Sequence, residues 1–262
     1  MSEQDVRLPA GYRLQRFDHV GSTSDLARAA AEAGLAGPAV FWAVSQGTGR
    51  GRHGHRWVSP RGNLYATLLL RPDVPAKRLA ELSLLTAVAL AEAIMPWLRG
   101  GTTLSLKWPN DVLVNGAKVS GLLLETADTK ATRPAVLVGT GVNVASAPQG
   151  VPYPVCALND HATAPVPLER LLSGYLDAFE RWCGRWQSQG LAPVRAAWLA
   201  RAHGLGQHLH ARLGERRVSG AFRDLDPSGA LLLETAPGRV EAITAGEVFF
   251  PDARSELEGG PC

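Results

Sequence analysis

Apolar residues along the chain recur with two different periods, and these periods predict its helices and strands. Apolar positions at helical spacing predict helices over residues 22–33, 75–94, 168–186 and 193–203. Short apolar runs predict strands over residues 38–45, 63–70 and 135–144, and a hairpin over residues 104–125. Within the second helix, Leu79, Leu82, Leu85 and Ala89 fall on one face, so we expect it to be amphipathic.

The pattern changes after about residue 205. Four short strand-like segments follow one another at residues 208–213, 217–225, 230–235 and 240–249. Turn-forming residues separate them, such as the Pro237-Gly238 pair. Short strands at close spacing with turns between them indicate a small β-barrel.

The hairpin predicted over residues 104–125 contains polar residues that its fold does not require. Its turn is Asn115-Gly116, a dipeptide that strongly favours a tight two-residue turn. The fold of a hairpin does not account for the Lys-Trp-Pro-Asn-Asp cluster at residues 107–111, nor for Lys118 three residues before Gly121. These residues are therefore candidates for chemistry.

A second candidate is the glycine- and arginine-rich segment at residues 46–57, which we call the arginine loop. No Asp or Glu occurs between residues 33 and 72, so no acidic residue nearby in the sequence neutralises its charge. Glycines let backbone N–H groups approach a ligand, and guanidinium groups bind phosphate and carboxylate. The segment predicts an anion-binding loop; a basic surface loop or an RNA-binding segment would show the same composition.

Together these motifs resemble the bacterial biotin protein ligases. The family's Gly-Arg-Gly-Arg-x-Gly loop corresponds to residues 49–54. Its Lys-Trp-Pro-Asn-Asp block and its Lys-x-x-Gly correspond to residues 107–111 and 118–121. A Gly-x-Gly-x-Asn at residues 139–143 and a Ser-Thr motif at residues 22–24 complete an ordered set of four.

The resemblance implies an α+β fold in two parts. Residues 1–205 would form a catalytic domain with a mixed β-sheet flanked by helices, a class II synthetase-like fold shared with lipoate ligases. Residues 206–262 would form a small SH3-like β-barrel with a frayed tail. Members that repress transcription carry a DNA-binding domain before the catalytic one. Because the Ser-Thr motif begins at Ser22, we expect a monofunctional biotin–[acetyl-CoA-carboxylase] ligase.

The reaction that the resemblance implies has two steps. Biotin attacks the α-phosphate of ATP to give biotinyl-5′-AMP, and a lysine of a biotin carboxyl carrier protein then takes the biotin. The carrier belongs to acetyl-CoA carboxylase or another biotin-dependent carboxylase. Because a carboxylate meets a phosphate in the first step, cations must offset the repulsion. Lys118 is the candidate for this role, with Arg52 and Asp111 completing the catalytic set.

The resemblance and the chemistry of the side chains assign the other site residues. The biotin-binding candidates are Ser22, Thr23, Ser24, Gln46, Gly49, Arg50, Gly51, Arg52, Lys118 and Gly121. The ATP-binding candidates are Arg50, Arg52, Trp57, Asn110, Lys118 and Asn143. Asp111 has two open roles, as a ligand of Mg²⁺ or as the group that orients Lys118 or Lys107.

Several assignments have a plain structural alternative. Ser22 and Asp25 resemble a helix capping box, Trp57 fits a core position, and Asn143 fits a turn. The chain also departs from the family at His53 and His55, where arginine is common, and at Ser24, where asparagine is common.

The composition of the chain bears on its cellular compartment and on its binding partners. The net charge of +3 is small for a dedicated nucleic-acid binder. Three scattered cysteines give neither a disulfide framework nor zinc spacing, which suits the cytoplasm. We find no signal peptide and no apolar run long enough to span a bilayer, so we expect neither a nucleic-acid nor a membrane partner. Some family members dimerise through a sheet edge, which leaves a homodimer open.

Two other functions remain as alternatives. A lipoate–protein ligase would share the Lys-x-x-Gly but not the arginine loop. An RNA-binding module would use the loop for phosphate contacts and stacking. We also expect the loop to be mobile without ligand and to become ordered over biotinyl-AMP, because its arginines repel one another and a bound anion supplies the missing charge.

Overall fold

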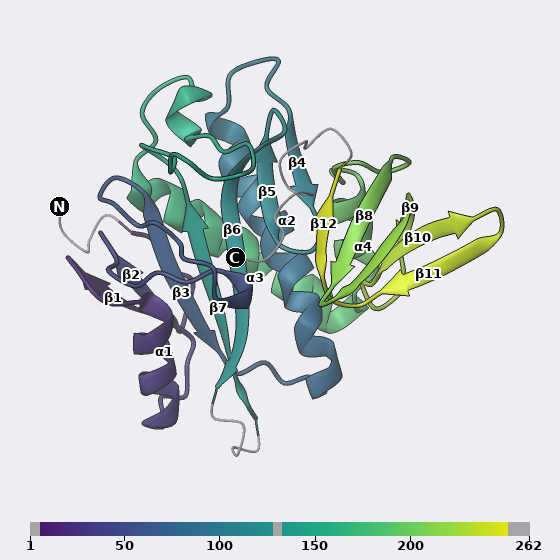
Figure 1. Cartoon of the computed structure of the whole chain (residues 1–262). Coiled ribbons are helices and arrows are strands. Elements are labelled where there is room, and N and C mark those ends of the chain that lie inside the picture. The colour runs from purple at the N-terminus through teal and green to yellow at the C-terminus, as the bar shows by residue number, and fades with distance from the viewer. Residues whose placement is uncertain (1–5, 128–132, 251–262) are drawn as a thin grey trace.

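The computed structural model describes residues 6–127 and 133–250, and these form two sheets with helices packed around the larger one (Figure 1). The larger sheet has seven strands in the order β1-β2-β3-β7-β6-β5-β4. Its strands are β1 (Arg13–Phe17), β2 (Ala39–Ala43), β3 (Leu64–Leu70), β4 (Leu104–Lys107), β5 (Asp111–Val114), β6 (Ala117–Ala127) and β7 (Ala135–Val142). Only β1 and β2 pair in parallel among these neighbours, so the sheet is mixed, as expected.

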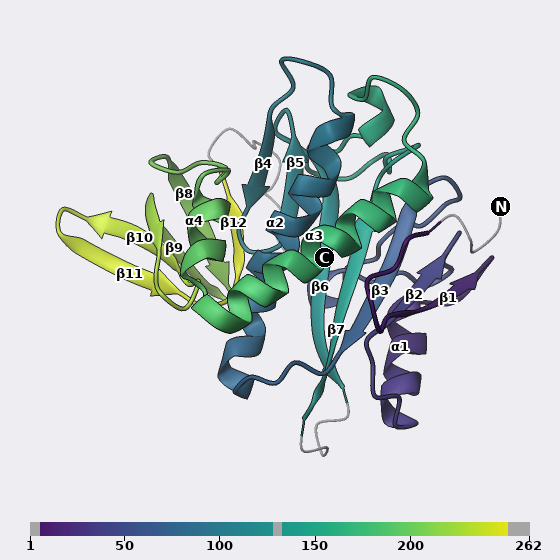
Figure 2. The same ribbon diagram turned by 180° about the vertical axis from the view of Figure 1, so that it is seen from behind.

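Helices cover both faces of this sheet. Helix α1 (Thr23–Glu32) packs Ala27 and Ala31 against Phe41 and Leu137 on one face. The opposite face carries the main core beneath α2 (Leu82–Ile94) and α3 (Leu168–Gln189), and α4 (Ala192–Leu199) packs against both of these helices next to the smaller sheet (Figure 2). Successive strand residues point to opposite faces, so a strand such as β2 contributes to both cores and is buried along its whole length.

The helix predicted over residues 75–94 differs from the expectation. It begins as a 3₁₀ segment (Ala76–Glu81). In α2 eleven of the 13 residues are buried, whereas an amphipathic helix would bury only one face. The prediction that no apolar run could span a bilayer is also wrong by length and composition, because residues 76–97 qualify. Since 67% of the qualifying window is buried inside the protein, the segment has the placement of a core helix.

The hairpin contains one strand more than the sequence indicated. Asn115 and Gly116 both have positive φ, 50° and 79°, as a tight turn between antiparallel strands requires, so the predicted turn is confirmed. The segment before it is split, however, because Trp108, Pro109 and Asn110 turn the chain between β4 and β5. Strand β1 was also missed, since its sequence RLQRF shows no strict alternation.

The smaller sheet is antiparallel with the order β11-β10-β9-β8-β12. Its strands are β8 (His208–Leu213), β9 (Arg216–Leu225), β10 (Leu231–Ala236), β11 (Arg239–Ile243) and β12 (Glu247–Phe249). The segment predicted as one strand over residues 240–249 is thus two strands, separated near Gly246. The domain boundary near residue 205 stays a prediction, and the predicted frayed tail at residues 251–262 lies outside the described residues.

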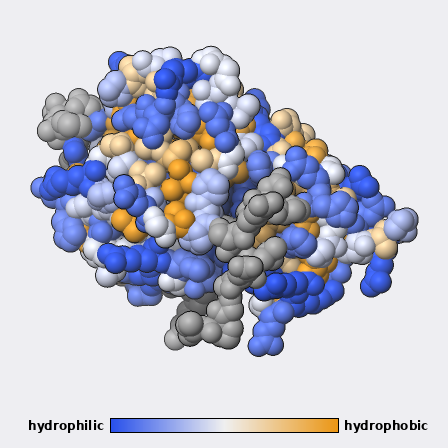
Figure 3. All heavy atoms as spheres, turned by 45° about the horizontal axis from the view of Figure 1, so that its top comes forward, coloured by the Kyte–Doolittle hydropathy of each residue, from blue (hydrophilic) through white to orange (hydrophobic). Residues whose placement is uncertain are grey.

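A mostly hydrophilic surface covers both parts in the view of Figure 3, with apolar residues gathered near its middle.

Candidate active site

A cavity of about 680 Å³ lies where the arginine loop, the β4–β6 hairpin and the smaller sheet meet. It gathers most of the residues singled out from the sequence: Ser22, Thr23, Ser24, Gln46, Arg50, Gly51, Arg52, Trp57, Asn110, Asp111, Lys118 and Gly121. Two candidates do not line it, namely Gly49 and Asn143. Segments that lie far apart in the sequence therefore form one site.

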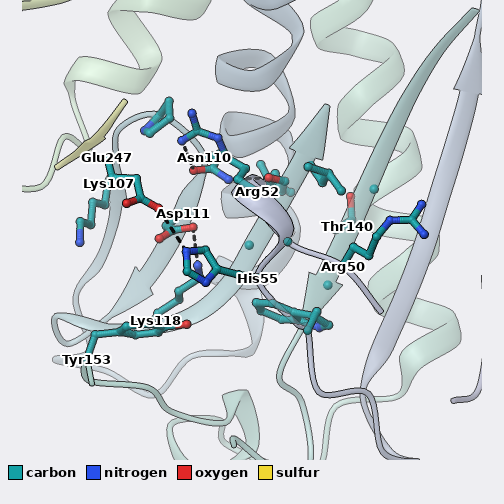
Figure 4. Close-up of a pocket in the computed structure, with 18 of the residues that line it drawn as sticks. Arg50, Arg52, His55, Lys107, Asn110, Asp111, Lys118, Thr140, Tyr153 and Glu247 are labelled. Atoms are coloured by element: carbon teal, nitrogen blue, oxygen red, sulfur yellow. Dashed lines mark hydrogen bonds and ion pairs between the residues drawn. The ribbon is translucent and has the colours of Figure 1, made fainter. Parts of the chain in front are cut away.

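Lys118 and Asp111 form an ion pair inside this cavity. The Lys118 Nζ lies 2.8 Å from Asp111 Oδ1, and the two side chains are only 18% and 17% exposed. The rings of Trp57 and Tyr153 each lie with their centroids 5.6 Å from the same Nζ, and Figure 4 shows Tyr153 beside Lys118. A shielded ammonium group held by a carboxylate and two aromatic rings is oriented, unlike a solvated hairpin lysine. Of the roles left open for Asp111, the geometry favours orienting Lys118 over Lys107.

The two central arginines of the loop take opposite directions (Figure 4). Arg52 donates to Gly246 O at 2.9 Å and to Asn110 Oδ1 at 3.5 Å, beside the Lys118–Asp111 pair. Burial lowers the pKa of Arg52, and the negative charges of Glu247 and Asp111 oppose that shift. Arg52 therefore places its charge on the wall of the cavity, next to Asn110.

Arg50 instead binds Asp25 on helix α1. Its two terminal nitrogens donate to the two carboxylate oxygens at 2.8 and 2.6 Å, and this hydrogen bonding raises the pKa of Arg50 and lowers that of Asp25. Asp25 therefore neutralises one arginine of the loop, although no acidic residue lies between residues 33 and 72 of the sequence. The expected capping box is also incomplete, because Ser22 accepts from Ser24 N while the Asp25 carboxylate binds Arg50.

A set of uncharged polar side chains occupies the part of the cavity near helix α1. Gln46 Oε1 accepts hydrogen bonds from Thr23 N at 2.9 Å and from Thr23 Oγ1 at 3.0 Å. Thr67 Oγ1 lies 2.8 Å from Thr23 Oγ1 and 3.2 Å from Ser24 Oγ. Sequence reasoning missed Thr67, although a lone threonine within the apolar strand LYATLLL was a usable signal.

Two facing glycines leave room for the indole of Trp57. Gly121 and Gly141 are register partners on β6 and β7. A Cβ would come within 3.0 Å of the Trp57 ring at Gly121 and within 2.5 Å at Gly141. Trp57 therefore packs flat on the sheet, and its Nε1 is buried without a hydrogen-bond partner among the described residues. Gly49 is needed for packing too, since a Cβ there would lie 2.5 Å from Trp57 O.

Asn143 directly follows the end of β7 and does not line the cavity. The residue is 2% exposed, its N–H donates to Val119 O at 2.8 Å, and its carbonyl accepts from Leu158 N at 2.8 Å. Its backbone continues the pairing of β7 with β6 and is not in a turn, so neither the predicted ATP contact nor the turn alternative is confirmed.

Other lining residues carried no signal in the sequence. They include Tyr153, His203, Arg212 and Glu247. Burial raises the pKa of Glu247, but the hydrogen bond from Arg212 and the charges of Arg212, His53 and His55 outweigh it, so the net shift is downward. Arg212 and Glu247 come from β8 and β12, so only the packing of the smaller sheet against the larger part places them here.

The described residues contain no group of three or more His, Cys, Asp or Glu side chains that could hold a metal ion by themselves. Asp111 offers the cavity a single carboxylate next to an ammonium group. Mg²⁺ is commonly held by one or two carboxylates, waters and substrate phosphates. This donor set therefore fits Mg²⁺ only when the metal arrives with a polyphosphate.

Comparison with known proteins agrees with this site. Residues 21–143 match the Biotin/lipoate A/B protein ligase family, and residues 204–250 match the Biotin protein ligase C terminal domain. The chain is 44% identical over 223 residues to the biotin–[acetyl-CoA-carboxylase] ligase of Paracoccus denitrificans, covering 83% of this chain and 92% of that protein. It is 33% identical to the Mycobacterium tuberculosis protein of the same name, covering 94% and 93%.

The solved structures agree as well. The biotin protein ligase from Aquifex aeolicus in complex with biotin and ATP superposes with a TM-score of 0.78 at 25% identity, covering 90% of this chain and 97% of that one.

Proposed function

The chain belongs to the biotin protein ligase family, and from that premise we propose how its cavity carries out the reaction. The protein is an ATP-dependent, AMP-forming biotin–[acetyl-CoA-carboxylase] ligase. The alternatives of a lipoate–protein ligase and an RNA-binding module are set aside, since the full-length relatives are biotin ligases. The observation that carries the assignment of roles is the shielded Lys118–Asp111 pair beside Arg52.

In the first step a carboxylate oxygen of biotin attacks the α-phosphorus of ATP, and the bond to the β-phosphate bridging oxygen breaks. Pyrophosphate leaves and biotinyl-5′-AMP remains. Lys118 lies between the two anions and offsets their repulsion, and Asp111 holds the ammonium group in place. Arg52 adds a second cation at the phosphate. Asp111 could help hold a Mg²⁺ ion that arrives with ATP, and the ion would then neutralise phosphate charge.

In the second step an amine of the acceptor lysine attacks the carbonyl carbon of the mixed anhydride. The C–O bond to phosphate breaks, AMP leaves, and the amine loses a proton as the amide forms. Lys118 and Arg52 stabilise the departing phosphate charge. The acceptor is a biotin carboxyl carrier protein of a biotin-dependent carboxylase.

The two substrates occupy different parts of the cavity. Uncharged groups near helix α1, namely Thr23, Ser24 and Gln46, suit the ureido group of biotin, which offers one acceptor and two donors. Trp57, Asn110 and Arg52 line the cavity around Lys118 and suit the nucleotide. Because Gln46 already accepts from Thr23, biotin would exchange or share those hydrogen bonds.

The test is to supply purified protein with biotin and Mg-ATP. We expect pyrophosphate release, and transfer of biotin with AMP release once a biotin carboxyl carrier domain is added. Lipoate in place of biotin is the control substrate and should give neither. A folded preparation that releases no pyrophosphate and labels no carrier domain would refute the proposal.

A further inference from the structure

The arginine loop ends in a compact turn, whose contacts lie partly within itself and partly with the smaller sheet. Within the turn, Gly51 N donates to His55 O at 2.7 Å, and His55 N donates to Arg52 O at 3.0 Å. These bonds keep residues 51–55 together, so the turn can move as a unit. Whether it stays over the cavity depends on what its side chains contact outside it.

The outward contacts of this turn reach the start of strand β12. Arg52 donates to Gly246 O at 2.9 Å, a bond between residues 194 positions apart. His55 Nε2 lies 3.7 Å from Glu247 Oε1. The same turn reaches the larger sheet through the longer contact from Arg52 to Asn110, at 3.5 Å. The closest bond that holds the turn is therefore made with the smaller sheet.

The start of β12 is built to hold its position. Glu247 is the register partner of Arg212 on β8, and the two side chains form an ion pair. Gly246 has φ of 148°, and a Cβ there would lie 2.6 Å from Arg212 O. The Gly246 carbonyl and the Glu247 carboxylate thus face the loop from a strand that is fixed to its neighbour.

We propose that Glu247 is a positioning residue that, with the Gly246 carbonyl, holds the arginine loop over the cavity and so retains biotinyl-AMP. The anhydride is sensitive to water and to stray amines, so a loop that opens early would release it. This proposal rests on the proposed function. It adds that retention of biotinyl-AMP depends on the smaller sheet, through the Glu247 carboxylate, which need not touch the ligand.

The chain offers a matched control for the test. Glu241 on β11 also pairs with an arginine of a neighbouring segment, Arg216, and its side chain is 25% exposed, as is that of Glu247. Glu241 does not line the cavity. Glu247→Ala and Glu241→Ala therefore remove the same kind of pair from the same sheet, one near the loop and one away from it.

The experiment measures release of radiolabelled biotinyl-AMP. Enzyme is loaded with labelled biotin and Mg-ATP, freed of excess substrate and chased with unlabelled biotin and Mg-ATP. We expect Glu247→Ala to speed release by about 3–10-fold, the range for losing an ion pair and weakening a charged hydrogen bond. The single-turnover rate of adenylate formation should change much less, and Glu241→Ala should match the wild type.

Further variants separate positioning from folding. Glu247→Gln keeps the size of the side chain and serves if the alanine variant fails to fold; it too should speed release. His55→Ala should act in the same direction, and adding it to Glu247→Ala should give less than the product of the two effects. Unchanged release in the Glu247 variants, or equal acceleration by Glu241→Ala, would overturn the proposal. A wild type that forms no adenylate would overturn the proposed function instead.

Discussion

The two segments that build the active site are held in place in different ways. The β4–β6 hairpin places Lys118 and Asp111 through backbone pairing between adjacent strands, closed by the Asn115-Gly116 turn. The arginine loop places Arg50 and Arg52 through side-chain contacts with Asp25 on one side and Gly246 on the other. The hairpin is thus a fixed scaffold for chemistry, whereas the loop depends on contacts that can be broken and made again.

The fixed part should show the largest effect on chemistry. We expect Lys118→Ala to slow adenylate formation by about 10²–10³-fold, because the lost cation acts on charge that develops in the transition state. Biotin binding should fall much less. Pyrophosphate release and biotin calorimetry measure the two effects. The exposed Lys77 provides the control variant Lys77→Ala, which should behave as the wild type. Wild-type turnover in Lys118→Ala would show that the assigned role is wrong.

The movable part should show its effect on retention. We expect Arg52→Gly to release biotinyl-AMP, because the variant loses both the cation beside the phosphate and the bond to Gly246 O. Free biotinyl-AMP acylates lysines of unrelated proteins, so bystander labelling of a lysine-rich protein is the measurement. Wild-type enzyme at matched adenylate production is the control. Labelling no greater than this control would count against Arg52 as a retaining group.

The smallest effect should come from the other end of the loop. If Arg50 anchors the loop through Asp25, then Asp25→Ala, Arg50→Ala and the double variant should weaken biotin binding equally, by about 2–5-fold for an exposed pair. If Arg50 binds ligand directly, as its place among the predicted binding residues implies, Arg50→Ala alone should weaken binding and Asp25→Ala should not. Calorimetry with biotin separates the two outcomes.

The pH dependence of this pair follows from the shift at Asp25. Its pKa is lowered by the hydrogen bond from Arg50. A carboxylate with a lowered pKa contributes its stability above the pKa of the unfolded chain and loses it as the pH falls through the lower folded value. The anchor should therefore stay intact at neutral and mildly acidic pH, and the affinity difference between wild type and Asp25→Ala should vanish only in strong acid.

Sequence reasoning succeeded where neighbours along the chain decide the structure. The Asn115-Gly116 turn needs only a few adjacent residues and formed as predicted, and Ser22 caps helix α1 even though the capping box with Asp25 did not form. Sequence reasoning failed where contacts between distant segments decide the structure. Strand β1 exists because it pairs with β2, and α2 is buried on nearly all sides because the sheet, α3 and α4 surround it.

The same division holds within the active site. The sequence by itself singled out Lys107, Asp111 and Lys118 as candidates on one short hairpin, in which Lys107 is the register partner of Asp111 and Lys118 is that of Leu113, two residues from Asp111. Only the tertiary structure decided how the charges pair. Arg50 pairs with Asp25, and Arg52 donates to the carbonyl of Gly246. Arg212 and Glu247 line the cavity from the smaller sheet. Charge pairing acts through space over a few ångströms, so separation along the chain says little about it.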